Sequence, residues 1–150
     1  MVHKLLGVLE PIRCFLVEID DHFDSSVICE ILTDKPKSNP SREKCREYLY
    51  KVLTQKKARM TLLNLGELNK VILYKITERN DKLKAIDTVK DWLDGGVELC
   101  SPQYKAFEIA LELKVRDWHL EPLDMLHIAT AIEKKAKRFV TIEDSILKKK

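Results

Sequence analysis

Short runs of apolar residues alternate along the chain with longer segments in which apolar residues recur at helical spacing. The short runs are typical of buried strands. They predict strands over residues 13–19 (with an extension toward Phe23 left open), 58–63, 97–100 and 138–141. The longer segments predict helices over residues 24–32, 41–55, 65–76, 81–93, 101–115 and from Pro122 onward, and residues 143–147 close the chain as a turn or short helix.

Local signals support the starts of several of these helices. Ser41 is predicted to cap a helix after a loop, residues 34–40, that contains two prolines. Ser101 followed by Pro102 predicts a cap and a proline at the first helical position, and Pro122 marks another helix start. Because strands and helices alternate, we expect an α/β fold in three layers, α/β/α, with a central parallel sheet covered by helices on both faces.

Length and composition fit a single domain with a substantial core. The chain has 150 residues, of which 45% are hydrophobic. We predict one domain over residues 1–150, with residues 1–12 as an N-terminal extension. No apolar run has membrane-spanning length, and Met1–Leu9 lacks the features of a secretory signal peptide. These features predict a cytoplasmic protein without a membrane partner.

Cysteine and charge usage add two constraints. The four cysteines (Cys14, Cys29, Cys45 and Cys100) form no CxxC pair, so we expect free thiols rather than disulfides or zinc ligands. The net charge of +3 is nearly balanced, but basic residues gather in three runs, which are residues 56–59, 134–138 and 148–150. Such runs are usually solvated surface, and they also suit a polyanionic partner.

Acidic residues follow the strands or open the helices of this predicted fold. Asp24 follows the first strand, and Glu67 lies in the first turn of the helix after the second strand. Asp124 opens the helix before the last strand, and Glu143 and Asp144 follow that strand. In a parallel α/β sheet the ligands bind at the carboxyl ends of the strands. The acids are therefore expected to converge in one cleft, although each alone is also a good helix-start residue.

The segment around Asp124 carries the clearest signal. Asp124 stands at the front of an apolar, small-residue stretch, Leu123–Ala131. Further apolar positions, at Ala129, Ile132, Ala136 and Phe139, favour a largely buried helix. A buried carboxylate without a partner is costly. Asp124 therefore either bonds to the backbone N–H groups at the helix start or faces a cleft and holds a metal with other acids.

A cluster of carboxylates predicts a particular metal chemistry. Without cations the acids would repel one another and raise each other's pKa values. Oxygen ligands favour Mg²⁺ or Mn²⁺ over zinc. Such ions activate a water and neutralise charge during phosphodiester hydrolysis, and the lysines are suited to hold a nucleic-acid backbone.

Four segments in this order resemble the motifs of the PIN domain, the nuclease fold of VapC-type toxins. They are Asp24–Ile28, Leu65–Leu68, Leu123–Ala131 and Phe139–Asp144, and the third is the most specific match. The resemblance extends from about Phe15 to Leu147.

The resemblance implies that Asp24, Glu67 and Asp124 are acidic metal-site residues. The fourth acid of the family is usually an Asp two residues after a Thr. By spacing, that position is Glu143, and by residue type it is Asp144, so both remain candidates, with the spacing slightly favoured. The resemblance therefore implies a Mg²⁺ or Mn²⁺ site built from these five acids.

Other residues of the four motifs have two readings each. Thr141 either orients a water or a ligand carboxylate, or is an ordinary strand threonine. Ser25 is interpreted as a helix cap rather than a site residue. His127 is interpreted as a buried, hydrogen-bonded histidine rather than a ligand or general base. The first acid of the site has two rivals, Asp20 and Asp21, which directly follow the predicted strand.

The resemblance implies a metal-dependent endoribonuclease that hydrolyses phosphodiester bonds in RNA. It also implies a toxin that is inhibited by a cognate antitoxin protein and pairs as a homodimer. The alternative is a catalytically degenerate PIN-like module that binds RNA in an RNA-processing assembly. Glu143 in place of an Asp and the long segment before Asp24 motivate this alternative.

Overall fold

The computed structural model describes residues 20–33, 40–55, 58–116 and 119–147. Its centre is a four-stranded sheet in which all neighbours are parallel and the spatial order is β3-β2-β1-β4. The strands are β1 (Asp21–Phe23), β2 (Ala58–Thr61), β3 (Val97–Cys100) and β4 (Arg138–Val140). Because every strand runs in the same direction, the carboxyl ends of all four lie along one edge of the sheet.

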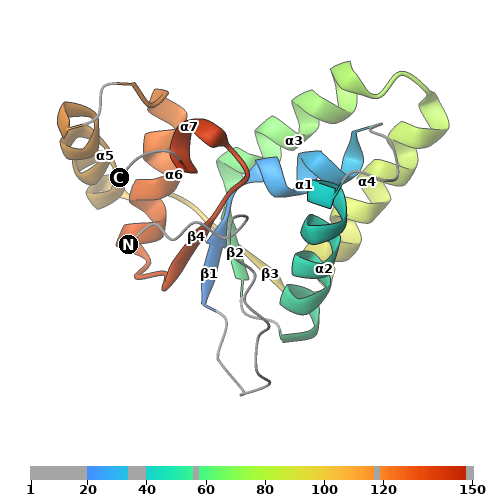
Figure 1. The fold of residues 1–150 in the computed structure, drawn as a ribbon, viewed down its shortest axis with the longest axis horizontal. Helices are drawn as coiled ribbons and strands as arrows, with labels where there is room; N and C mark the ends of the chain where they lie inside the picture. Colours follow the sequence, from blue (N-terminus) through green and yellow to red (C-terminus); the bar gives the residue numbers. More distant parts are fainter. Residues whose placement is uncertain (1–19, 34–39, 56–57, 117–118, 148–150) are drawn as a thin grey trace.

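Helices cover both faces of this sheet (Figure 1). One side carries α1 (Ser25–Leu32), α2 (Pro40–Gln55), α3 (Leu62–Lys75) and α4 (Arg79–Asp94). The other side carries α5 (Tyr104–Arg116), α6 (Pro122–Glu133) and the short α7 (Asp144–Leu147). The predicted three-layer α/β/α fold is therefore confirmed. Among the described residues, no helix is both long and apolar enough to cross a membrane.

The two larger of three apolar clusters among the described residues lie on opposite faces of the sheet. Neighbouring residues of β4 divide between them, because successive strand residues point to opposite faces. Val140 packs in the core that includes Phe23 of β1 and Val27 of α1. Phe139 packs in the other core, with Ile128 of α6. The same alternation determines which face of the sheet each polar strand residue occupies.

Asp20 and Asp21 lie at the amino end of β1, opposite the edge where the strands end. The buried Asp21 carboxylate accepts two hydrogen bonds from Arg138, at 2.7 and 2.9 Å, and one from the Tyr48 hydroxyl at 3.0 Å. Asp20 forms an ion pair with Arg59 at 3.2 Å. Neither carboxylate faces the carboxyl edge of the sheet, so these rivals of Asp24 serve as structural ion-pair partners.

The start of α3 differs from the sequence prediction. The predicted strand 58–63 ends at Thr61, and its last two residues already belong to the helix. Thr61 and Asn64 form a reciprocal capping box, which satisfies free N–H groups at the start of α3. The predicted position of Glu67 in the first turn was therefore wrong, and Glu67 lies in the second turn.

Other predicted boundaries also shift. Ser101 and Pro102 are not helical, and α5 begins at Tyr104, where the Ala106 N–H bonds to the Gln103 carbonyl. Helix α2 begins at Pro40 instead of after a Ser41 cap, because a proline at the first helical position forgoes no hydrogen bond.

Helix α6 begins at Pro122 as predicted, but it ends at Glu133. Ala136 and Phe139 therefore lie beyond the helix, and Ile132 is 41% exposed. The expected all-apolar helix is buried mainly along Met125–Ala131. The predicted strand 13–19, Cys14 and the N-terminal extension lie outside the described residues, whereas Cys29 and Cys100 are free thiols as predicted and Cys45 forms no disulfide with another described cysteine.

Candidate metal centre

Asp24 stands where β1 gives way to α1, at the carboxyl edge of the sheet. Its backbone N–H donates to the Val140 carbonyl at 2.9 Å, which ties it to β4. Although Asp24 holds the N-cap position of α1, its side chain makes no capping hydrogen bond. Its carboxylate instead accepts from the Thr141 hydroxyl at 2.9 Å, the Ser25 hydroxyl at 3.2 Å and the Asn64 amide at 3.4 Å. Asp24 therefore holds the N-cap position as the sequence allowed, but its carboxylate serves the site and does not cap the helix.

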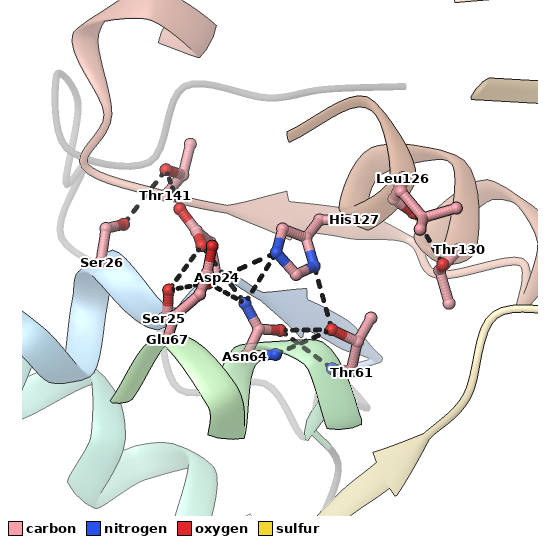
Figure 2. Close-up of polar contacts among 10 residues, drawn as sticks. All are labelled: Asp24, Ser25, Ser26, Thr61, Asn64, Glu67, Leu126, His127, Thr130 and Thr141. Atoms are coloured by element: carbon pink, nitrogen blue, oxygen red, sulfur yellow. Dashed lines mark hydrogen bonds and ion pairs between the residues drawn. The ribbon is translucent and has the colours of Figure 1, made fainter. Parts of the chain in front are cut away.

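Glu67 brings a second carboxylate to Asp24 from a different helix (Figure 2). Its Oε2 accepts from the Asn64 amide at 3.1 Å and from the Ser25 hydroxyl. The Nε2 atom of His127 lies 3.4 Å from the same oxygen. The Ser25 hydroxyl thus contacts both carboxylates, although its single proton serves one at a time. Ser25 is consequently part of the site and not merely a cap.

The hydrogen bonds around Glu67 keep it ionised. Burial by itself raises the pKa of Glu67, but its contact with His127 and the hydrogen bonds from Ser25 and Asn64 outweigh burial, so the pKa lies below its ordinary value. A carboxylate held in its charged form is a good ligand for a divalent cation.

Two of the residues behind Glu67, Thr61 and Asn64, were not expected from the sequence. Thr61, Asn64 and His127 are all buried, and they connect through hydrogen bonds from the end of β2 to the middle of α6. The spacing Thr61-x-x-Asn64 is the one signal that was available, because it is a variant of the capping box. The interpretation of His127 as a buried, hydrogen-bonded histidine agrees with this network, but the ring also faces the carboxylates.

Asp124 lies in the first turn of α6, half-buried beside the same cluster. Burial raises the pKa of Asp124 to about 6, with further contributions from Asp24, Glu143 and Glu67, while His127 opposes them. The three neighbouring carboxylates are thus close enough to affect its titration. The helix of Asp124, α6, lies on the opposite side of the sheet from α1, which Asp24 precedes, and from α3, which carries Glu67.

Glu143 and Asp144 follow β4 with different relations to the site. Partial burial, followed by the charges of Asp24 and Glu67, raises the pKa of Glu143. The Glu143 N–H donates to the Thr141 hydroxyl at 3.0 Å. Asp144 begins α7, and its charge raises the pKa of Glu143 less than the charges of Asp24 and Glu67 do. Glu143, the candidate favoured by spacing, is therefore close enough to Asp24 and Glu67 for their charges to raise its pKa.

Thr141 does more than occupy a strand end. Its hydroxyl donates to Asp24 Oδ2 at 2.9 Å and accepts from the Glu143 N–H, and it lies 3.2 Å from the Ser26 hydroxyl. This arrangement holds the Asp24 carboxylate in one orientation. The structure thus favours an orienting role for Thr141 over that of an ordinary strand residue.

The donor set fits a divalent cation. Ligand atoms of Asp24, Glu67 and His127 all lie within 4.8 Å of one another. Within the described part of the chain, no lysine or arginine forms an ion pair with Asp24, Glu67 or Asp124. Carboxylates gathered without a paired cation raise each other's pKa values, and a bound divalent ion relieves that repulsion.

The chain belongs to the PIN domain family, because the family model matches residues 23–150. The matched region includes every residue of the site, and membership of this family supports a nuclease. The structure is also similar to that of VapC20 from Mycobacterium tuberculosis, with a TM-score of 0.56 and 14% sequence identity. That match covers 83% of this chain and 90% of VapC20, which is described as a toxin that cleaves the sarcin–ricin loop. At this identity the likeness concerns the fold. No curated protein sequence matches the chain significantly.

The raised pKa of Asp124 predicts a stabilising substitution. Because its folded-state pKa of about 6 exceeds the ordinary value of 3.8, the ionised form is disfavoured in the fold. Stability is therefore lost as pH rises through this interval, and the full penalty applies above about pH 6. In EDTA near pH 8, Asp124→Asn should raise the free energy of unfolding by about 1 kcal/mol, a value discounted for solvent screening.

Urea unfolding of both proteins near pH 4 and near pH 8 checks this prediction. The difference should disappear near pH 4, where the wild-type carboxyl is largely protonated. A variant that is less stable than the wild type near pH 8 would contradict it.

Proposed function

We propose that this protein is a metal-dependent endoribonuclease that hydrolyses phosphodiester bonds in RNA and acts as the toxin of a toxin–antitoxin pair. The observation that carries the proposal is the convergence of Asp24 and Glu67 from different elements at the carboxyl edge of the sheet. No lysine or arginine of the described residues forms an ion pair with either acid. Its PIN family membership and its likeness to a ribonuclease toxin support the same reading.

The acids of the site are proposed to hold Mg²⁺ or Mn²⁺. Asp24, Glu67 and Asp124 are the inner candidates, with Glu143 as the fourth acid and Asp144 as its alternative. When bound, such an ion supplies an activated water and neutralises charge on the scissile phosphate.

The remaining polar residues then have positioning roles. Thr141 and Ser25 orient the Asp24 carboxylate through their hydroxyl groups. Asn64 donates to Glu67 from behind, so that the second carboxylate is held toward the first. Such fixed ligands lose little freedom when the substrate binds.

Partners and location follow from the proposed activity. RNA is the proposed substrate, with the basic runs suited to its phosphates. A cognate antitoxin and a second copy of this chain are the proposed protein partners, in the cytoplasm and without a membrane partner. Residues 1–150 are proposed to act as one domain, with residues 1–12 as an extension.

The alternative function is a degenerate PIN-like module that binds RNA in an RNA-processing assembly. The observation that favours it is Glu143, whose side chain is one carbon longer than the usual Asp. A degenerate site should bind Mn²⁺ weakly or not at all.

Cleavage of a structured RNA tests the proposal. The wild type, with Mg²⁺ or Mn²⁺, should cut the RNA, and EDTA should stop the reaction. Asp124→Asn, purified identically, should be inactive although it is expected to be at least as stable as the wild type. Cleavage by Asp124→Asn at the wild-type rate would overturn the assignment, because it would point to a contaminating ribonuclease or a different site. Absence of both cleavage and metal binding in the wild type would favour the RNA-binding alternative.

A further inference from the structure

The orientation of the Asn64 amide follows from its backbone partner. The Asn64 side-chain oxygen accepts the Thr61 backbone N–H at 3.0 Å. The amide nitrogen must then face the other way, where it lies 3.1 Å from Glu67 Oε2 and 3.3 Å from His127 Nε2. Because a carboxylate only accepts hydrogen bonds, this orientation agrees with the chemistry on both sides of the amide.

The position of the Thr61 proton follows next. Its hydroxyl lies 2.9 Å from the Asn64 side-chain oxygen, which can only accept. Thr61 must therefore donate its single proton to Asn64. The same hydroxyl lies 2.9 Å from His127 Nδ1, so this second contact requires the imidazole to donate its Nδ1–H.

The neutral His127 ring therefore presents a lone pair on Nε2. That nitrogen lies 3.3 Å from the Asn64 amide nitrogen, whose two hydrogens have Glu67 and Asp24 as acceptors, and 3.4 Å from Glu67 Oε2. The ring is 1% exposed, so solvent does not reach it. A lone pair placed against carboxylate oxygens in a buried position is unfavourable unless a cation or a proton lies between them.

Metal-binding histidines show this same arrangement. The nitrogen that does not bind the metal usually donates to an oxygen acceptor, which fixes the tautomer and the direction of the ring. Here Thr61 is that acceptor, and the free nitrogen points to the two carboxylates whose oxygens lie within 4.8 Å of it. Histidine also broadens the choice of ion, because a nitrogen ligand favours first-row transition metals over Mg²⁺.

We propose that His127 Nε2 is a direct metal ligand, which joins Asp24 and Glu67 in a mixed nitrogen–oxygen site that prefers a first-row transition ion such as Mn²⁺ to Mg²⁺. The inference rests on the metal centre of the proposed function. It replaces the reading of His127 as a purely structural residue.

Pulsed electron paramagnetic resonance with MnCl₂ as the probe tests this ligand directly. The full wild-type chain should bind Mn²⁺ and show the ¹⁴N modulation of a coordinated imidazole. His127→Gln should lack the ¹⁴N signal, and its Mn²⁺ dissociation constant should rise by at least the roughly 10- to 100-fold that loss of an outer-shell partner typically costs. Mg²⁺ affinity should fall by a smaller factor, so that the preference for Mn²⁺ over Mg²⁺ decreases. His119→Ala, which removes an exposed imidazole, serves as the matched control and should retain the signal.

The possible failures are distinguishable. If the wild type binds Mn²⁺ without a ¹⁴N signal, the inference about His127 is overturned while the carboxylate centre remains. If the wild type binds no Mn²⁺, both the inference and the proposed metal dependence are overturned. The nitrogen signal is read in the wild type itself, so the test still decides if His127→Gln fails to fold.

Discussion

Asp24→Asn is expected to reduce metal-dependent RNA cleavage by about 10²- to 10³-fold. Stabilisation of transition-state charge by a bound metal is worth several kcal/mol, and each 1.36 kcal/mol changes the rate tenfold. The substitution removes the charge that the Thr141, Ser25 and Asn64 donors hold in place. It also turns an amide nitrogen toward some of those donors. Initial rates on a structured RNA, with saturating Mn²⁺, measure the effect.

Asp20→Asn is the matched control for this loss. The substitution is chemically identical but lies at the opposite end of β1, where Asp20 pairs with Arg59. Its cleavage rate should stay close to that of the wild type. The reverse result, with Asp20→Asn inactive and Asp24→Asn active, would show that the first acid of the site had been misassigned.

Arg138→Met is expected to lower the free energy of unfolding by about 3 kcal/mol. Loss of one partner of a buried ion pair typically costs about 3–5 kcal/mol, because the other charge is left buried. The Asp21 side chain is 0% exposed and Arg138 is 35% exposed, which favours the lower end of that range. Tyr48 would remain as a neutral donor, since burial and the nearby Asp21 hold its pKa well above its usual range. Urea unfolding near pH 7 gives the value.

A second substitution separates the buried charge from lost packing. Asp21→Asn in the Arg138→Met background removes the uncompensated charge and keeps an acceptor for the Tyr48 hydroxyl. Most of the lost stability should return. If the double variant is as unstable as Arg138→Met alone, the loss arises from packing of the arginine stem and not from the Asp21 charge.

Much of the candidate site could be predicted because topology alone brings strand ends together. Asp24 directly follows β1 and Glu143 comes three residues after β4, so their convergence needs only the alternation of strands and helices. The partners of those acids were beyond such reasoning. Thr61 was predicted to lie inside a strand, and Asn64 was given no role. The same residues can either extend the strand or form a capping box, and the sequence pattern alone did not distinguish the two. Their hydrogen bonds to His127 join residues 63 and 66 positions apart.

The sequence by itself determined the order of strands and helices, the parallel sheet with two covered faces, and the identity of the acids at the strand ends. These features follow from local periodicity and from the way parallel strands share one edge. Only the tertiary structure decided that Asp21 is a buried ion-pair partner, that Asp24 turns away from its helix, and that His127 faces two carboxylates. Those outcomes depend on which face a side chain occupies and on the direction of each hydrogen bond, which are set by packing between distant segments.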